Sequence, residues 1–99
     1  KPSLAPIKVA VFPLQRDDKL RESAYNLYRG LKTKFTAEFD DSGNIGKMYR
    51  RQDEIGTPFC VTVDYQSLED NMVTIRSRDT MAQERIKLDE VANYISSKL

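Results

Sequence analysis

The first predicted strand of this chain is its most constraining segment, because apolar side chains occupy both of its faces. Ile7, Val9 and Val11 share one face, and Ala10 and Phe12 share the other. A strand with one face in water alternates apolar with polar residues instead. The pattern therefore predicts a central strand that other layers cover on both sides.

The rest of the chain can supply those layers. Stripes such as Leu20, Ala24, Leu27 and Leu31 predict amphipathic helices, and short alternating runs predict strands. We expect strands at 7–12, 35–39, 59–64, 72–78 and 83–88, helices at 17–34, 45–55 and 89–99, and a turn at 65–71. Strands joined through a helix pair in parallel, whereas the short turn makes the fourth strand antiparallel to the third. The predicted fold is α/β: three layers, α/β/α, around a mixed five-stranded sheet with one antiparallel strand.

The length of 99 residues predicts a single domain. Residues 1–6 contain two prolines and are expected to form an extended lead-in or linker. The chain begins at Lys1 rather than methionine, and it ends at Leu99 within an apolar-periodic segment. We therefore expect a piece of a larger protein.

The amino-acid composition predicts that these residues contain no catalytic site. Histidine is absent, which excludes Ser-His and Cys-His nucleophile pairs and most zinc hydrolase sites. The single cysteine, Cys60, lies in an apolar strand, which favours a packed core thiol and a reducing compartment. The segment from Gly43 to Lys47 lacks the glycine spacing of a nucleotide-binding loop. We predict no catalytic residue, no metal site, no cofactor and no membrane contact.

The charged residues are nearly balanced, with 16 basic and 15 acidic side chains. Any binding of nucleic acid must therefore come from local clusters. Lys47, Arg50, Arg51 and Glu54 lie off the apolar stripe of the second helix, and Arg76, Arg78 and Asp79 lie at the end of the fourth strand. A solvated face with weak ion pairs explains such clusters equally well. Arginine beside carboxylate is also what recognition of an unpaired base requires.

Three segments carry a resemblance to a known family: residues 4–14 (LAPIKVAVFPL), 40–64 (DDSGNIGKMYRRQDEIGTPFCVTVD) and 73–83 (VTIRSRDTMAQ). They resemble the C-terminal anticodon-binding domain of glycyl-tRNA synthetases, which are class II aminoacyl-tRNA synthetases. Ser77 and Met48 depart from residues common in the family. The resemblance implies an anticodon-binding fold and a parent enzyme, usually a homodimer, that joins glycine to tRNA with ATP and Mg²⁺. It also implies a cytoplasmic protein, with a mitochondrial form as the alternative.

The resemblance further implies that the domain binds the anticodon stem-loop of a glycine tRNA and packs with the catalytic domain of its parent. We expect the helix and strand clusters to converge into the binding surface. Acceptors for base amines would come from Asp53, Glu54 and Asp79, donors from Arg76 and Arg78, and phosphate contacts from Lys47, Arg50 and Arg51. Phe12 is either a stacking platform for an unpaired base or a core residue.

Alternative interpretations share the fold or its general class. Prolyl, threonyl and histidyl synthetases carry a related domain, and so does an accessory subunit of mitochondrial DNA polymerase, where it would be an RNA or protein interaction module. The stretch from Arg51 to Pro58 favours the glycyl family. A small flavodoxin-like enzyme would need a glycine-rich loop after the first strand, and residues 13–17 contain no glycine.

Overall fold

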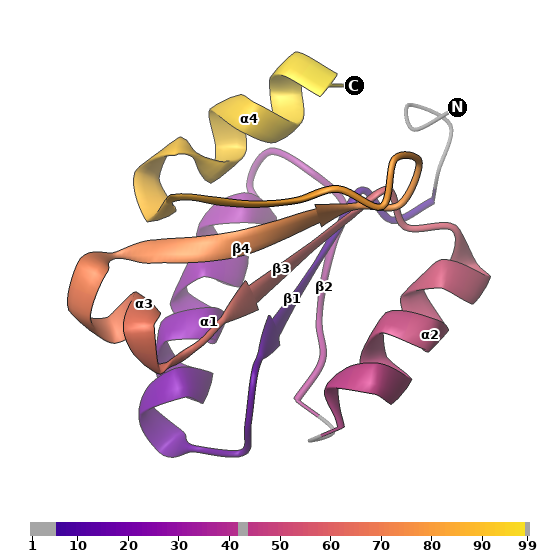
Figure 1. The fold of residues 1–99 in the computed structure, drawn as a ribbon. Helices are drawn as coiled ribbons and strands as arrows, with labels where there is room; N and C mark the ends of the chain where they lie inside the picture. Colours follow the sequence, from indigo (N-terminus) through magenta and orange to yellow (C-terminus); the bar gives the residue numbers. More distant parts are fainter. Residues whose placement is uncertain (1–5, 42–43, 99) are drawn as a thin grey trace.

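The computed structural model describes residues 6–41 and 44–98. Most of the predicted lead-in, Gly43 and Leu99 fall outside these ranges. The elements follow in the order β1 (Val9–Pro13), α1 (Asp18–Leu31), β2 (Ala37–Phe39), α2 (Ile45–Ile55), β3 (Phe59–Val63), α3 (Tyr65–Asp70), β4 (Met72–Ser77), β5 (Gln83–Lys87), the 3-10 turn η2 (Leu88–Glu90) and α4 (Val91–Lys98). Figure 1 shows their arrangement.

The strands form one five-stranded sheet in the order β2-β1-β3-β4-β5. β1 pairs in parallel with β2 and β3, whereas β4 is antiparallel to both β3 and β5. β4 is therefore the one strand that runs against the other four. The predicted mixed sheet with a single antiparallel strand is confirmed.

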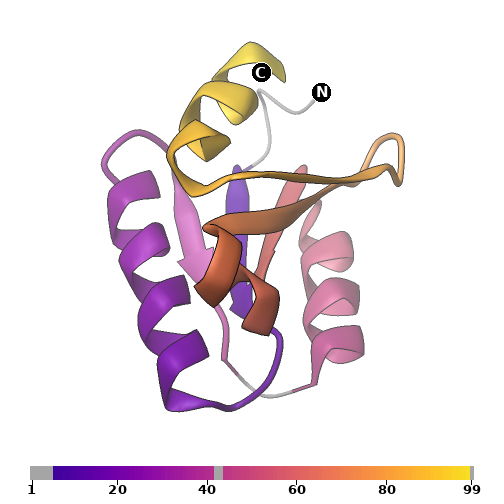
Figure 2. The ribbon, with the colours of Figure 1, turned by 60° about the vertical axis from the view of Figure 1, so that its left-hand side comes forward.

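Helices cover the sheet on both faces, as the two-sided pattern of the first strand predicted. Figure 2 shows α1 and α2 on opposite sides of the sheet. On the α1 side, Leu20 and Ala24 join Val91 and Ile95 of α4 in one buried cluster with alternate residues of the strands. On the α2 side, Met48 closes a smaller cluster over the other strand face. The fold is the predicted three-layer α/β/α arrangement.

Local signals start both long helices and end α2 as expected. The Asp17 carboxylate caps α1 by accepting from the backbone N–H groups of Lys19 and Leu20. The Asn44 side chain accepts from the Lys47 N–H and caps α2. Gly56 ends α2 with φ of 90°, a left-handed conformation that glycine adopts without the steric cost of a Cβ.

Some element boundaries differ from the predictions. β1 begins at Val9 and includes Pro13, which pairs with Val63 and leaves the ladder intact because the Leu14 N–H donates to the Val63 carbonyl. α1 ends at Leu31 rather than at residue 34, and η2 replaces the end of the last predicted strand. No helix of the described residues is long and apolar enough to cross a membrane.

The segment predicted as a turn at residues 65–71 instead contains the short helix α3. Asp64 and Ser67 form a reciprocal capping box, in which each side chain accepts from the backbone N–H of the other residue. Asn71 ends the helix with φ of 57°. This link still reverses the chain between β3 and β4, so the topology that the turn implied is unchanged.

Candidate functional site

The C-terminal half of α2 and the end of β4 bring together residues that are far apart in the sequence. Tyr49 and Asp53 lie one helical turn apart on α2, so both side chains project from the same face. Arg76 projects from the face of β4 that α2 covers, because it pairs with Cys60 of β3 in the sheet register and Cys60 packs beneath α2. These positions form the centre of the candidate site, which we call the Arg76 cluster: Tyr49, Asp53, Arg76, Arg78 and Met81.

The Arg76 guanidinium has three neighbours in this cluster. Its Nη2 atom lies 3.8 Å from Asp53 Oδ2 and donates to the Met81 sulfur at 3.3 Å. Its central carbon lies 4.7 Å from the centre of the Tyr49 ring, in cation-π geometry. The Arg76 side chain is 13% exposed. A thioether is a weak acceptor and the carboxylate is at the long end of ion-pair distance, so the protein holds the guanidinium with weak polar contacts.

Tyr49 is held from three sides and was not among the predicted site residues. Phe12 meets its ring edge-on with centroids 5.4 Å apart, and its hydroxyl shares a 2.7 Å hydrogen bond with Thr62 Oγ1. Burial raises the pKa of the Tyr49 hydroxyl, and the hydrogen bond with Thr62 opposes that shift only in part. Its four-residue spacing from Asp53 was the sequence signal that could have found it.

Arg78 joins the same cluster from the end of β4. Its Nε donates to the backbone carbonyl of Asp53 at 3.3 Å, and its backbone N–H donates to the Pro58 carbonyl at 2.8 Å. The side chain is exposed. The structure therefore brings Arg76, Arg78 and Asp53 together, as the sequence predicted for the helix and the strand end.

The remaining predicted residues are exposed around this centre. Arg51 pairs with Glu38 of β2, with Nη2 3.2 Å from Oε1, and so lies toward the opposite edge of α2. Lys47 is in the first turn of α2, about 9 Å along the helix axis from Asp53. Arg50 and Glu54 are exposed on α2, and Asp79 is exposed in the turn after β4. Their contacts to phosphates or bases stay predictions.

The prediction of Phe12 as a stacking platform is wrong. Its side chain is fully buried and packs with Ala10, Met48 and Cys60 between the sheet and α2. Because α2 covers this face, no base can reach the ring without displacing the helix. Phe12 is instead a core residue, which was the alternative interpretation, and its ring packs against that of Tyr49.

Cys60 is a packed core thiol, as predicted. Burial, reinforced by the negative charge of Asp53, raises the pKa of the thiol to about 12. The nucleophilic thiolate is therefore scarce at neutral pH. The described residues also contain no group of three or more His, Cys, Asp or Glu side chains that could hold a metal ion.

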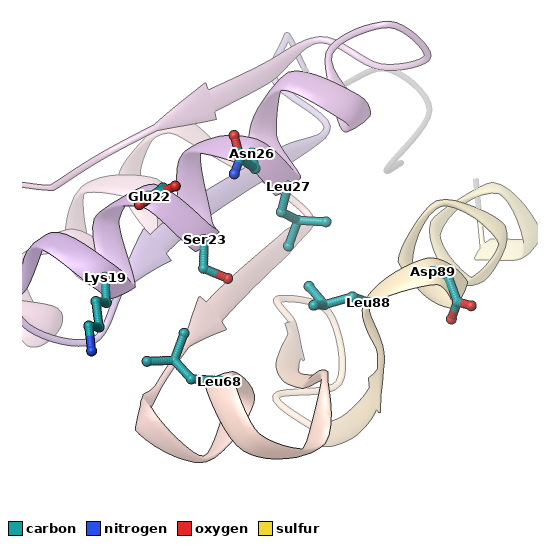
Figure 3. Close-up of a pocket in the computed structure, with 8 residues that line it drawn as sticks. All are labelled: Lys19, Glu22, Ser23, Asn26, Leu27, Leu68, Leu88 and Asp89. Atoms are coloured by element: carbon teal, nitrogen blue, oxygen red, sulfur yellow. The ribbon is translucent and has the colours of Figure 1, made fainter.

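A groove of about 740 Å³ lies on the opposite side of the sheet, between α1, α3 and η2. Figure 3 shows Leu27, Leu68 and Leu88 turned toward this space, with charged side chains such as Asp89 at its rim. Its lining contains no arginine and no residue of the Arg76 cluster. The groove is therefore a separate surface feature, mostly apolar in character.

Comparisons with known proteins find relatives over nearly the whole chain. A glycine–tRNA ligase from Caldanaerobacter subterraneus is 61% identical over 98 residues, and one from Streptomyces coelicolor is 56% identical over the same length. Each alignment covers 99% of this chain but 21% of the relative. The chain therefore spans about a fifth of the length of the curated relatives it matches.

Structural and family comparisons point the same way. The RNA binding domain of threonyl-tRNA synthetase from Cryptosporidium parvum superposes with a TM-score of 0.82 at 27% identity, covering 93% of this chain and 23% of that one. The family model described as an anticodon binding domain matches residues 8–98. This chain belongs to the anticodon-binding domain family of the aminoacyl-tRNA synthetases.

Proposed function

We propose that this domain recognises the anticodon of a glycine tRNA through the Arg76 cluster. The observation that carries the proposal is the Arg76 guanidinium, which lies against the Tyr49 ring, beside Asp53, and donates to the weak acceptor sulfur of Met81. The high identity to glycine–tRNA ligases supports glycine as the amino acid. A polar cluster of this kind, half-buried at the edge of a helix, suits one flipped-out base better than a duplex.

The chemistry of glycine anticodons fits the cluster. Glycine codons begin with two guanines, so the paired anticodon positions are two cytosines. The Watson–Crick edge of cytosine presents an amine donor beside two acceptors. Asp53 would accept from the amine, and Arg76 would donate to the acceptors. Glu54, Asp79 and Arg78, each within three residues of Asp53 or Arg76 in the sequence, would serve the second cytosine.

Phosphate contacts would come from the exposed cations of α2. Lys47, Arg50 and Arg51 are exposed along this helix. Contacts to phosphates fix the position of the RNA without specifying its sequence, so these residues would set affinity rather than selectivity. With a formal net charge of only +1, the isolated domain should bind weakly and with strong dependence on salt.

The glycylation reaction itself would take place elsewhere in the parent protein. The relatives are about five times longer than this chain, and a catalytic domain in that remaining length would bind ATP and Mg²⁺ and join glycine to the tRNA. In this proposal the parent is a cytoplasmic homodimer. The present domain would orient the tRNA and would take no part in the chemical steps.

A binding titration tests this function directly. A labelled glycine tRNA, the same tRNA with both anticodon cytosines replaced by uracil, and a threonine tRNA would be titrated against the domain by fluorescence anisotropy at several salt concentrations. We expect the glycine tRNA to bind best, with affinity falling steeply as salt rises. A preference for the threonine tRNA would favour another class II synthetase, and equal binding of all three would refute anticodon recognition.

A further inference from the structure

Met81 has an unusual backbone conformation in the turn between β4 and β5. Its φ is 59°, in the left-handed region, and its N–H donates to the Ser77 carbonyl at 2.8 Å. The Ser77 N–H in turn donates to the Ala82 carbonyl at 3.0 Å, so the turn is closed on both sides. This conformation strains a residue that carries a Cβ, whereas glycine adopts it freely. The backbone alone gives no reason for a methionine here.

The Met81 side chain is also unusually open to solvent. It is 58% exposed, more than Tyr25, Tyr65 or Leu68, the other large apolar side chains that stand out from the described surface. Its contact with the cluster is the weak hydrogen bond that its sulfur accepts from Arg76. Most of its apolar surface therefore faces water directly beside the guanidinium.

We propose that Met81 is a further base-contacting residue of the RNA-binding surface, forming an apolar wall against which an unpaired base packs. The neighbouring Arg76 supplies the directed N–H donors, and Tyr49 holds that guanidinium in place from its other side. Apolar surface next to a few fixed polar groups is the usual composition of a site for a planar organic ligand. A polarisable thioether suits such a flat surface well.

The chemistry of the thioether selects a base over a phosphate as the occupant. A thioether carries no charge and no N–H or O–H donor, so it offers nothing to a phosphate oxygen. A nucleobase has an apolar face for the methionine and polar edges for Arg76. The inference rests on the proposed function, and it adds that the base, rather than the backbone, lies against the turn.

Oxidative footprinting of the unmodified protein tests the contact. Hydrogen peroxide converts an exposed methionine into its sulfoxide, and peptide mass spectrometry reports the rate at each position. Saturating glycine tRNA should slow oxidation of Met81 at least severalfold. Met48 is 1% exposed and should stay slow with or without RNA, which confirms that the fold is intact. Oxidation of Met81 at an unchanged or faster rate in the complex would overturn the proposal.

Matched variants separate a base contact from a backbone effect. Met81→Gly removes the wall while relieving the positive φ, so the domain should stay folded but bind glycine tRNA roughly three- to tenfold more weakly. Met81→Leu keeps an apolar wall and should lose less affinity. Among the described residues other than glycine, Asn71 also has a positive φ, of 57°, and it lies outside the Arg76 cluster, so Asn71→Gly should bind as the wild type does.

The salt dependence separates the loss of a base contact from the loss of a phosphate contact. Because no phosphate contact is lost, Met81→Gly should leave the slope of log affinity against log salt unchanged. A shallower slope, or wild-type affinity in Met81→Gly, would refute the base contact while leaving anticodon recognition standing. If the wild-type domain itself showed no preference for the glycine tRNA, the proposed function would fail, and this inference with it.

Discussion

The guanidinium carbon of Arg76 lies 4.7 Å from the centre of the Tyr49 ring, so an arginine of the sheet rests on an aromatic residue of α2. The ring is itself fixed by Phe12 and by the Thr62 hydroxyl. Side chains locked in this way keep the donor group oriented before any ligand arrives. Tyr49 thus contacts both a buried core residue, Phe12, and the arginine at the surface, Arg76.

Tyr49 variants should separate the contribution of its ring from that of its hydroxyl. Tyr49→Phe loses the hydrogen bond with Thr62 and should lower the free energy of unfolding by about 1 kcal/mol, with tRNA affinity nearly kept. Tyr49→Leu also loses the cation-π contact, so affinity for glycine tRNA should fall clearly. Chemical denaturation and tRNA titration measure the two effects. Equal losses of affinity in both variants would show that the ring does not position Arg76.

Asp64 should make the domain less stable in acid. Burial pushes the pKa of its carboxyl up, but hydrogen bonds from Ser67 and the Arg85 guanidinium, 3.0 Å away, outweigh burial and hold the pKa below its ordinary value. A lowered pKa in the folded state stabilises the fold. This stabilisation is complete at pH values above the unfolded pKa of about 3.9, and it is lost as the pH falls through the folded pKa.

Denaturation of the wild type and of Asp64→Asn at a series of pH values checks this effect. The asparagine can still cap α3 but does not titrate, so its free energy of unfolding should decline less steeply below about pH 4. Identical pH profiles for the two proteins would rule out Asp64 as a source of acid sensitivity.

Cys60 should resist alkylation in the folded protein. Its thiol is buried and its pKa is raised to about 12, so iodoacetamide at pH 8 should react only as the chain unfolds. Because the folded pKa is the higher one, this group stabilises the fold below its unfolded pKa of about 8.5, and the contribution fades as pH rises toward the folded value. Rapid labelling of Cys60 without denaturant would contradict the structure.

Two glycines should respond to alanine in opposite directions. Gly56 has φ of 90° at the end of α2, so Gly56→Ala should destabilise the domain by about 1 kcal/mol or more. Gly30 lies within α1, and a Cβ there would meet no atom within 4 Å, so Gly30→Ala should stabilise by roughly 0.5–1 kcal/mol. Thermal unfolding of both variants gives the comparison, and a stabilised Gly56→Ala would disprove the left-handed cap.

Much of the fold could be predicted because the strongest signals are local and repeated. Apolar residues on both faces of β1 indicated a central strand, and Val9, Ala10, Val11 and Phe12 are all fully buried. The sequence left Phe12 as either a stacking platform or a core residue, and the structure places it in the core. Helix α3 was missed because a capping box, rather than an apolar stripe, stabilises so short a helix.

The candidate site was predictable only in part. The convergence of Arg76 with Asp53 followed from placing the charged clusters on a helix and a strand of one known domain type. Tyr49 and Met81 escaped notice because an aromatic ring on a helix and a methionine in a turn are common. Their importance depends on distances to Arg76 that only the packing of α2 against β4 determines.

Replacement of Arg76 tests whether this residue recognises an anticodon base. The affinities of the wild type, Arg76→Ala and Arg78→Ala would be measured for glycine tRNA and for the tRNA with both anticodon cytosines replaced. Arg76→Ala should weaken the binding of glycine tRNA by about 1–3 kcal/mol and the binding of the altered tRNA much less. The preference of the domain for glycine tRNA over the altered tRNA would then be lost. Equal losses on both RNAs would contradict base recognition by Arg76.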